Sequence, residues 1–427
     1  MLDLRRIREE PQFVREQLAR RGNPEYIELV DQVLTLDEER RALIGETDAL
    51  RAQRNEASAE IARLKREGRA EEADRRIVEM RAVGERLAAL EARLAEVEEG
   101  VRDRLLRIPN LPEPDVPPGG EEDKVVVRQW GEPRQFDFEP RPHWELGEAL
   151  GLLDLPRGAR IAGSGFPLFL GMGARLERSL INLMMDLHSR EHGYTEAWPP
   201  ILVNQAAATG TGHLPKFRED MYEIEADGLF LVPTAELPIT NIHAGELLDA
   251  DALPARYVAY TPCFRREAGA HGRDTRGLIR LHQFDKVELV RFERPENGRA
   301  ALEELTAHAE AVLQRLELCY RVVLLPAGDL GFANAMTYDL EVWAPGVQRW
   351  LEVSSCSLYT DYQARRANIR FRPAPGARPE FVYTLNGSGL ALPRTVIALL
   401  ETHQDASGAV RIPEALASYL GTDRIHA

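Results

Sequence analysis

The N-terminal quarter of the chain carries an apolar pattern that only long helices satisfy. Residues 26–101 are helical in composition, and apolar side chains recur every seven positions in the first half and alternately every three and four in the second. The first series is Leu29, Leu36, Leu43, Leu50, Ala57 and Leu64; the second is Met80, Val83, Leu87, Leu90, Leu94, Val97 and Val101. Because the charged, glycine-containing stretch 65–69 separates them, we predict two helices of about 50 Å each, folded into an antiparallel hairpin.

Such an arm could instead pair between two chains as an intermolecular coiled coil. Against this, the first helix has Arg40, Thr47 and Arg54 where a second apolar series would be required. Toward the predicted tip, basic residues suited to phosphate contacts are interleaved with acids. These basic residues are Arg54, Arg63, Lys65, Arg66, Arg69, Arg75 and Arg76.

A segment rich in proline and glycine, residues 108–120, ends the helical region. Beyond Val125 the sequence changes to short strands, turns and scattered helices, which is typical of a mixed α+β domain. We therefore predict an N-terminal domain over residues 1–108 with its arm at about 27–100, a linker over 109–122 and a second domain over 123–427.

Composition restricts the class of protein further. The net charge of −15 argues against nonspecific coating of nucleic acid, although a local basic patch remains compatible with it. No apolar run approaches the length of about 18 residues needed to span a membrane, and no signal peptide is evident, so we expect a cytoplasmic protein. The three cysteines lack CxxC spacing, which predicts neither a disulfide framework nor a cysteine zinc site.

A β-hairpin with a long polar loop is predicted around residues 261–290. Side chains on a strand alternate between faces, so Arg265 and Glu267 would share one face of the first strand, and Phe284, Lys286 and Glu288 one face of the second. An arginine, carboxylates and an aromatic ring could thus converge on one small polar ligand. A solvated charged hairpin is the alternative.

Other segments carry weaker signals, each with an ordinary structural alternative. Thr234-Ala235-Glu236 follows an apolar strand and is also a common helix cap. A strand over 350–355 ends in Glu352-Val353-Ser354-Ser355, whose oxygens suit Mg²⁺. Residues 386–389 (Asn-Gly-Ser-Gly) are predicted to form a turn before a helix with Arg394 in its first turn, which is either an anion site or a plain connection. A helix over 174–192 leads into a strand whose proline pair, 199–200, belongs at a sheet edge or a subunit boundary.

Longer segments make these signals specific when they are taken together. They are GARLERSL (173–180), GHLPKF (212–217), PTAELPITN (233–241), EAGAHGRDTRGLIRLHQFDKVEL (267–289), YDLEVW (338–343), SSCS (354–357), DYQARRANIR (361–370) and TLNGSGLALPRT (384–395). With Phe264-Arg265-Arg266-Glu267 and Arg394 they resemble motifs 2 and 3 of class II aminoacyl-tRNA synthetases. Over nearly the whole chain the sequence resembles bacterial-type seryl-tRNA synthetases.

This resemblance implies a six- or seven-stranded antiparallel sheet flanked by helices, and a homodimer formed around residues 174–203. It implies ligation of L-serine to tRNA(Ser), using ATP and Mg²⁺, through a seryl-adenylate; serylation of selenocysteine tRNA is a side possibility. The arm would be an intramolecular coiled coil that contacts the variable arm of the tRNA, and the basic residues named above near its tip would be the tRNA-binding residues. Zinc is not expected. We also expect the loop 268–280 to move between ATP and the tRNA acceptor end.

Residue roles follow by matching motifs. Arg265, Glu352 and Arg394 would be catalytic: Arg265 at the α-phosphate and the serine carboxylate, Arg394 at the γ-phosphate, and Glu352 with Ser355 on Mg²⁺. Phe284 would stack on adenine and Glu267 would bind its amino group. The ATP set also includes Arg266, Val353 and Ser354, and the serine set is Thr234, Ala235, Glu236, Arg265, Glu288, Asn386 and Ser388. Which of Glu236 and Glu288 binds the serine ammonium stays open, with Glu288 and Ser388 favoured for the hydroxyl.

Two departures from the class pattern are noted, Ala391 at a glycine position and Pro393 before Arg394; proline is tolerated early in a helix. Two rival functions share the class II resemblance. A paralogue that loads an amino acid onto a carrier protein would lack the N-terminal arm, and a non-catalytic RNA-binding adaptor would not need Arg265, Glu267, Glu352 and Arg394.

Overall fold

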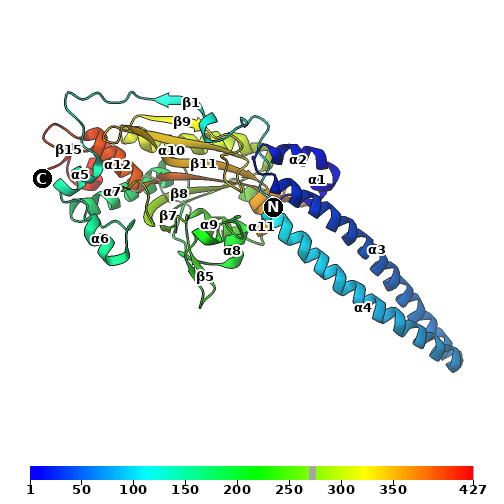
Figure 1. The fold of residues 1–427 in the computed structure, drawn as a ribbon. Helices are drawn as coiled ribbons and strands as arrows, with labels where there is room; N and C mark the ends of the chain where they lie inside the picture. The colour runs from blue at the N-terminus through cyan, green and yellow to red at the C-terminus, as the bar shows by residue number, and fades with distance from the viewer. Residues whose placement is uncertain (269–275, 427) are drawn as a thin grey trace. The chain divides into compact units, whose positions relative to one another are not determined.

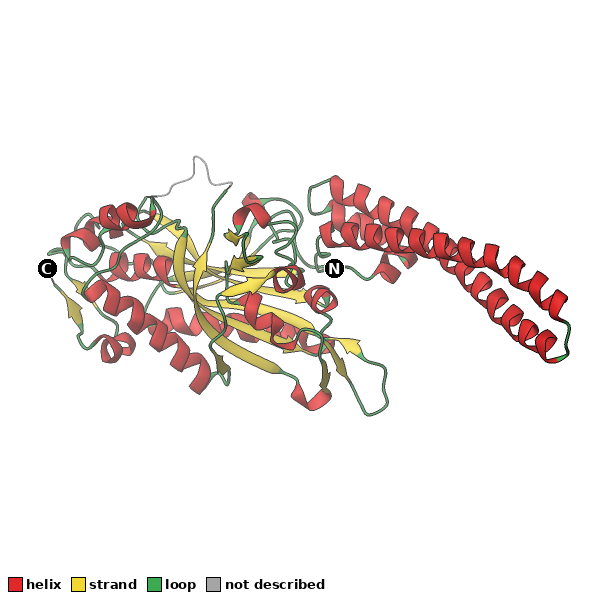
Figure 2. Cartoon of the chain, turned by 90° about the horizontal axis from the view of Figure 1, so that it is seen from below, coloured by secondary structure: helices red, strands yellow, loops and turns green. Residues whose placement is uncertain are grey.

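The computed structural model describes residues 1–268 and 276–426, in two compact units. One unit comprises residues 2–19 and 23–109 and is entirely helical. The other comprises Met1, residues 20–22 and residues 110–427 and is built on a large sheet. Figure 1 shows the two long helices of the first unit, and Figure 2 shows the sheet and helices of the second.

The helical unit is an antiparallel hairpin with two short helices at its base, which confirms the predicted fold of the arm. Its helices are α1 (Leu4–Glu9), α2 (Pro11–Ala19), α3 (Glu25–Arg66) and α4 (Ala70–Arg107). Gly68, with φ of +76°, makes the turn between α3 and α4. Leu43, Ala57 and Leu64 of the first apolar series are buried. Thr47 is buried too, and its hydroxyl donates to the Ile44 carbonyl at 2.9 Å. Because this polar group is hydrogen-bonded within its own helix, it does not interrupt the intramolecular seam.

A buried carboxylate braces the base of the arm. Asp37 of α3 is 1% exposed and accepts from Arg40 at 2.8 Å and Arg41 at 3.2 Å. Arg8 of α1 approaches it at 3.5 Å. Burial alone would raise the pKa of Asp37, but hydrogen bonding to Arg40 and the charges of Arg40, Arg8 and Arg41 outweigh it and hold this pKa below its ordinary value. One aspartate thus links α1 to the long helix.

The second unit is organised by a sheet of eight strands in the order β1-β9-β10-β11-β14-β8-β7-β2. All neighbours are antiparallel except β2, which joins β7 in parallel at one edge. The class is therefore as predicted, with more strands than the six or seven implied. The bounds are β1 Val125–Trp130, β2 Thr195–Ala197, β7 Ala255–Phe264, β8 Gln283–Glu293, β9 Tyr320–Leu324, β10 Met336–Ala344, β11 Arg349–Thr360 and β14 Tyr383–Ala391.

Helices bury one face of this sheet. Leu180 of α7, Leu305 of α10 and Ile397 of α12 are fully buried in the core cluster that also contains Val287 and Leu289 of β8. The α helices of this unit are α5 His143–Ala149, α6 Leu155–Ala162, α7 Met172–Asp186, α8 Gln205–Gly210, α9 Glu236–Thr240, α10 Gly298–Arg315, α11 Tyr362–Ala367, α12 Leu392–His403 and α13 Glu414–Leu420. None of the described helices is long and apolar enough to cross a membrane.

Three small sheets complete this unit. They are β13 (Glu380–Phe381), β12 (Arg370–Arg372) and β6 (Leu247–Asp249); β15 (Val410–Arg411) and β16 (Arg424–Ile425); and β3 (Leu202–Asn204), β5 (Leu229–Leu231) and β4 (Glu223–Ile224). The expectation that the proline pair at 199–200 lies within a strand is wrong, because the pair separates β2 from β3, which belong to different sheets.

The turn predicted at residues 386–389 is also wrong, since these residues lie inside β14 and the chain passes from Ala391 directly into α12. The glycines serve close packing. A Cβ at Gly387 would lie 2.2 Å from Leu305 Cδ2, and one at Gly389 would lie 3.0 Å from His188 Nε2. A Gly-Ser-Gly sequence that resembles a turn is thus a strand with helices pressed against it.

Candidate active site

A polar pocket of about 380 Å³ opens beside β14, whose Asn386 and Ser388 line it, while Gly387 between them faces Leu305 of α10. Its walls come from β8, β11 and β14, from the start of α9, from the first turn of α12, and from the segments that follow β7 and precede β8. Eleven predicted site residues line it: Thr234, Glu236, Arg265, Glu267, Phe284, Glu352, Val353, Ser355, Asn386, Ser388 and Arg394. Residues spread over 161 positions of sequence therefore meet at one cavity.

Four predicted residues do not line this pocket. Glu288 lies beneath it with no exposed side chain, and Ala235 is fully buried in a neighbouring core cluster. Ser354 points away, with its hydroxyl donating to the Ser388 carbonyl at 2.6 Å. Arg266 is exposed, and its backbone amide donates to the Asp220 carbonyl at 2.8 Å.

The predicted hairpin is formed by β7 and β8, in a register that pairs Cys263 with Phe284. The expectation that Arg265 and Glu267 belong to the first strand is wrong, because β7 ends at Phe264 and Glu267 has a φ of +52°. Both still line the pocket: the Arg265 guanidinium stacks over Phe284 at 5.0 Å, and Glu267 forms an ion pair with Arg280. Residues 269–275 of the loop expected to move lie outside the described residues.

The inner end of the pocket is a buried network of charged and polar groups. Lys286 Nζ pairs with Glu288 and donates to Thr234 Oγ1 at 2.8 Å. The Asn386 amide donates to both carboxylates, to Glu288 at 2.6 Å and to Glu236 at 3.0 Å. The Gln363 amide also donates to Glu236 at 2.6 Å, and the Tyr359 hydroxyl donates to the Asn386 amide oxygen at 2.7 Å. Two buried carboxylates are thus held about one amide, with a single cation beside them.

Their proximity changes how Glu236 ionises. Burial, and then the charge of Glu288, raise the pKa of Glu236 to about 7, although the Gln363 hydrogen bond and the charge of Lys286 act in the opposite direction. A carboxyl group with a pKa of about 7 can gain or lose its proton near neutral pH. An ammonium group entering the pocket would favour its ionised form.

The outer end of the pocket combines a cation with oxygen donors. Arg394, in the first turn of α12, donates to the Glu352 carbonyl at 2.7 Å and lies 3.5 Å from its carboxylate. Residues three apart on a regular strand point to opposite faces, but a β-bulge between Glu352 and Ser355 brings both side chains to the same face. It is the register shift that pairs Ser354 with Leu340 but Glu352 with Glu341, leaving Val353 as the extra residue.

Several lining residues had no predicted role, namely His213, Arg280, Lys286, Asn334, Ser357 and Tyr359. For Lys286 the sequence contained a signal, since it alternates with Phe284 and Glu288 on β8. Burial, followed by the charges of Arg265 and Lys286, lowers the pKa of His213 to about 4, so its ring is neutral near pH 7. Nothing in the sequence indicated that Tyr359 would reach Asn386.

The predicted tRNA-binding residues at the end of the arm are placed on either side of the α3–α4 turn. Arg54, Arg63, Lys65, Arg66 and Arg75 are exposed. Arg69 pairs with Glu72 and Glu67, and Arg76 pairs with Glu60 and Glu79. Part of the positive charge at the tip is therefore neutralised within the arm.

The sheet and its pocket define the core of a class II aminoacyl-tRNA synthetase, and comparison with known proteins agrees. A family described as "tRNA synthetase class II core domain (G, H, P, S and T)" matches residues 221–403, and one described as "Seryl-tRNA synthetase N-terminal domain" matches residues 1–112. A serine–tRNA ligase of Gemmatimonas aurantiaca is 54% identical over 422 residues, covering 99% of both chains. One of Carboxydothermus hydrogenoformans is 52% identical over 427 residues, with full coverage of both.

Among solved structures, a seryl-tRNA synthetase of Pyrococcus horikoshii complexed with ATP has a TM-score of 0.94 at 38% identity. The match covers 100% of this chain and 99% of that chain. The chain belongs to the seryl-tRNA synthetase family.

The buried pair yields a stability prediction. Lys286→Met leaves Glu288 without its cation, which should cost about 3–5 kcal/mol and lower the melting temperature by roughly 6 °C or more. Adding Glu288→Gln should restore most of this loss, because the uncompensated charge is then gone. Differential scanning calorimetry of both single variants and the double variant measures the coupling; additive losses would contradict the network.

Proposed function

We propose that this protein ligates L-serine to tRNA(Ser) in two steps, forming a seryl-adenylate from serine and ATP and then transferring serine to the tRNA. The observation that carries the proposal is the single pocket, which joins a buried pair of carboxylates to an outer end with Arg394 and oxygen donors. Full-length similarity to serine–tRNA ligases supports it and favours a tRNA over a carrier protein as acceptor. The family also supports a cytoplasmic location.

In the first step the serine carboxylate attacks the α-phosphate and pyrophosphate leaves. A carboxylate is already an anion at neutral pH, so the step needs alignment and charge neutralisation more than a general base. We assign Arg265 to the α-phosphate and the serine carboxylate, and Arg394 to the γ-phosphate. Phe284, already stacked under Arg265, would take the adenine ring, and Glu267 its amino group.

Serine recognition is assigned to the inner end. Glu236 lines the pocket, and with a pKa of about 7 it can lose its proton when a cation binds beside it. We therefore propose that it binds the serine ammonium together with Thr234. Ser388 and Asn386 would bind the hydroxyl, with Glu288 holding Asn386 from behind. A site that hydrogen-bonds a substrate hydroxyl can reject an analogue lacking it by about 10⁴-fold, which would exclude alanine.

Mg²⁺ is the metal we propose for the outer end. Glu352 and Ser355 present hard oxygen donors on one wall, and the buried Asp339 behind them has one oxygen without a hydrogen-bond partner among the described residues. No cluster of three His, Cys, Asp or Glu residues that could hold a metal occurs in the described part of the chain. This donor set fits Mg²⁺, which binds through one or two carboxylates and completes its shell with phosphates and water. When bound, it neutralises phosphate charge.

Two interaction surfaces complete the proposal. The arm would contact the variable arm of the tRNA through the exposed basic residues near its tip, and Arg266 would lie toward the acceptor end. Two copies would pair through the surface around residues 174–203. Trp198, beside the proline pair, is 80% exposed, and such a large apolar surface at a strand end favours a protein partner. Selenocysteine tRNA remains a second possible acceptor.

Amino-acid-dependent exchange of pyrophosphate into ATP tests the activity. We expect exchange with serine and at least about 10³-fold less with alanine, since the buried polar groups would be left unpaired. Arg265→Ala should reduce exchange severely through loss of charge-assisted contacts. No exchange with serine, or faster exchange with another amino acid, would contradict the proposal.

The role of the arm is tested by shortening it. Glu46 of α3 and Arg86 of α4 form an ion pair at 3.5 Å, so the two helices lie side by side at this level. Residues 50–83 can therefore be replaced by a short glycine–serine turn. We expect unchanged pyrophosphate exchange and a loss of tRNA serylation on the order of 100-fold, because phosphate contacts dominate nucleic-acid affinity. Normal serylation by the shortened protein would show that the arm is not the tRNA contact.

A further inference from the structure

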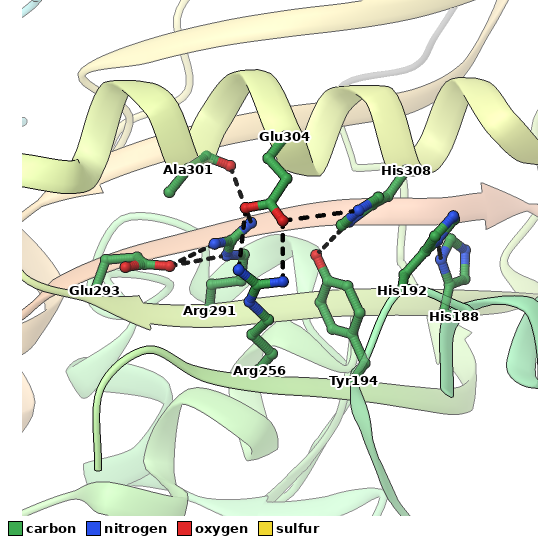
Figure 3. Close-up of polar contacts among 9 residues, drawn as sticks. All are labelled: His188, His192, Tyr194, Arg256, Arg291, Glu293, Ala301, Glu304 and His308. Carbon is green, nitrogen blue, oxygen red and sulfur yellow. Dashed lines mark hydrogen bonds and ion pairs between the residues drawn. The ribbon is translucent and has the colours of Figure 1, made fainter. Parts of the chain in front are cut away.

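A chain of three histidines lies behind the serine end of the pocket, on the helix-covered face of the sheet. Figure 3 shows His188 and His192 next to His308 of α10. His188 Nδ1 lies 3.0 Å from His192 Nδ1, and the His192 ring stacks on His308 with centroids 4.0 Å apart and planes 13° from parallel. None of these residues lines the pocket or has a role in the proposed reaction.

The first ring of this chain touches the strand that forms the pocket. His188 is fully buried and is carried by a π-helical turn, Leu187–Glu191, that continues α7. π-Helical turns within α-helices occur frequently at functional sites. A Cβ added to Gly389 would lie 3.0 Å from His188 Nε2 and 3.1 Å from Val287 Cγ1. The imidazole therefore occupies the space that any other side chain at position 389 would need.

Gly389 is the extra residue of a β-bulge. β14 pairs Ser388 with Glu288 and Leu390 with Val287, which leaves Gly389 between them without an opposite residue. A bulge disrupts the ladder locally and re-aims neighbouring side chains, so its position must be fixed by contacts outside the ladder. Ser354 supplies one, donating to the Ser388 carbonyl at 2.6 Å. His188 supplies the other, against Gly389.

Charged groups hold the far end of the histidine chain. The Tyr194 hydroxyl lies 3.1 Å from His308 Nδ1, and Glu304 lies 4.0 Å from His308 Nε2. Glu304 in turn pairs with Arg291 at 2.8 Å and Arg256 at 3.0 Å, from adjacent positions on β8 and β7 (Figure 3). His188 is thus linked, through His192 and His308, to the ion pairs between α10 and the strands β7 and β8.

The lowered pKa values of His188 and His308 keep these two imidazole rings uncharged near neutral pH. Burial, followed by His192 and His308, lowers the pKa of His188 to about 3, while its backbone contact with Gly389 opposes this. Burial and His192 lower that of His308 to about 4. Within the described residues no three ligands are grouped to hold a metal, so the cluster is not a metal site. An uncharged ring acts here through shape and hydrogen bonding.

We propose that His188 is a positioning residue for the serine site: it fixes the bulge at Gly389 and thereby the direction in which Ser388 enters the pocket. The inference rests on the proposed function, because it takes Ser388 to contact serine. Ser388 and Gly389 are consecutive, so a rotation of the backbone at the bulge would also displace the Ser388 hydroxyl. Misplacement of about 1 Å at a reacting site can cost up to about 100-fold.

The test is pyrophosphate exchange with serine and ATP varied separately. For His188→Ala we expect the KM for serine to rise about tenfold while the KM for ATP stays within about twofold, since only the serine end loses its support. His188→Gln, whose side chain can fill the same space against Gly389, should stay near the wild type. His403→Ala is the control, because His403 is also buried, donates from Nε2 to the Leu316 carbonyl oxygen at 2.9 Å and does not line the pocket.

Gly389→Ala approaches the same contact from the strand. Its methyl group should clash with the imidazole and raise the KM for serine, and His188→Ala combined with it should restore part of the loss because the methyl enters the vacated space. An unchanged KM for serine in His188→Ala or in Gly389→Ala, equal effects on both substrates as for His403→Ala, or additive effects in the double variant would overturn the proposal. If His188→Ala does not fold, Gly389→Ala alone decides. A wild type inactive with serine would instead refute the proposed function.

Discussion

The serine end of the pocket depends on one buried ion pair, between Lys286 and Glu288. Both side chains are almost completely removed from solvent, and a lone carboxylate there would be costly. Lys286 offsets part of that charge and also holds Thr234, while Asn386 divides its amide between Glu288 and Glu236. Loss of the Lys286 cation would therefore disturb four residues together that are assigned to serine, namely Thr234, Glu236, Glu288 and Asn386.

Two β-bulges adapt a regular sheet to this chemistry. At Val353 the bulge brings Glu352 and Ser355 to the same wall, where they can serve one metal and one nucleotide. The second bulge, at Gly389, directly follows Ser388, whose carbonyl accepts from Ser354, and Gly389 itself faces His188. Strict alternation along β11 would have turned Glu352 and Ser355 to opposite faces. The pocket therefore depends on irregularity at two positions of neighbouring strands.

The sequence predicted those parts of the structure that depend on local periodicity. The heptad series placed α3, α4 and their turn, and the alternation along residues 284–288 placed Phe284 and Lys286 on the pocket face. It failed where packing between distant segments decides. The glycines at 387 and 389 resembled a turn because their helical neighbours, Leu305 and His188, are far away in sequence. Arg265 and Glu267 were assigned to a strand that ends one residue earlier, and the link from Tyr359 to Asn386 left no local pattern.

The central claim is that Glu236 ionises to receive the serine ammonium, and proton release on binding tests it most directly. Because burial and Glu288 raise the pKa of Glu236 to about 7, we expect its carboxyl group to be mostly protonated at pH 6 and ionised at pH 8 before serine binds. Titration calorimetry of serine, run in two buffers of different ionisation enthalpy, should show release of most of one proton at pH 6 and little at pH 8, with affinity falling as the pH drops below 7. Glu236→Gln should abolish the release. No proton release at pH 6, or the same release from the Gln variant, would contradict the account.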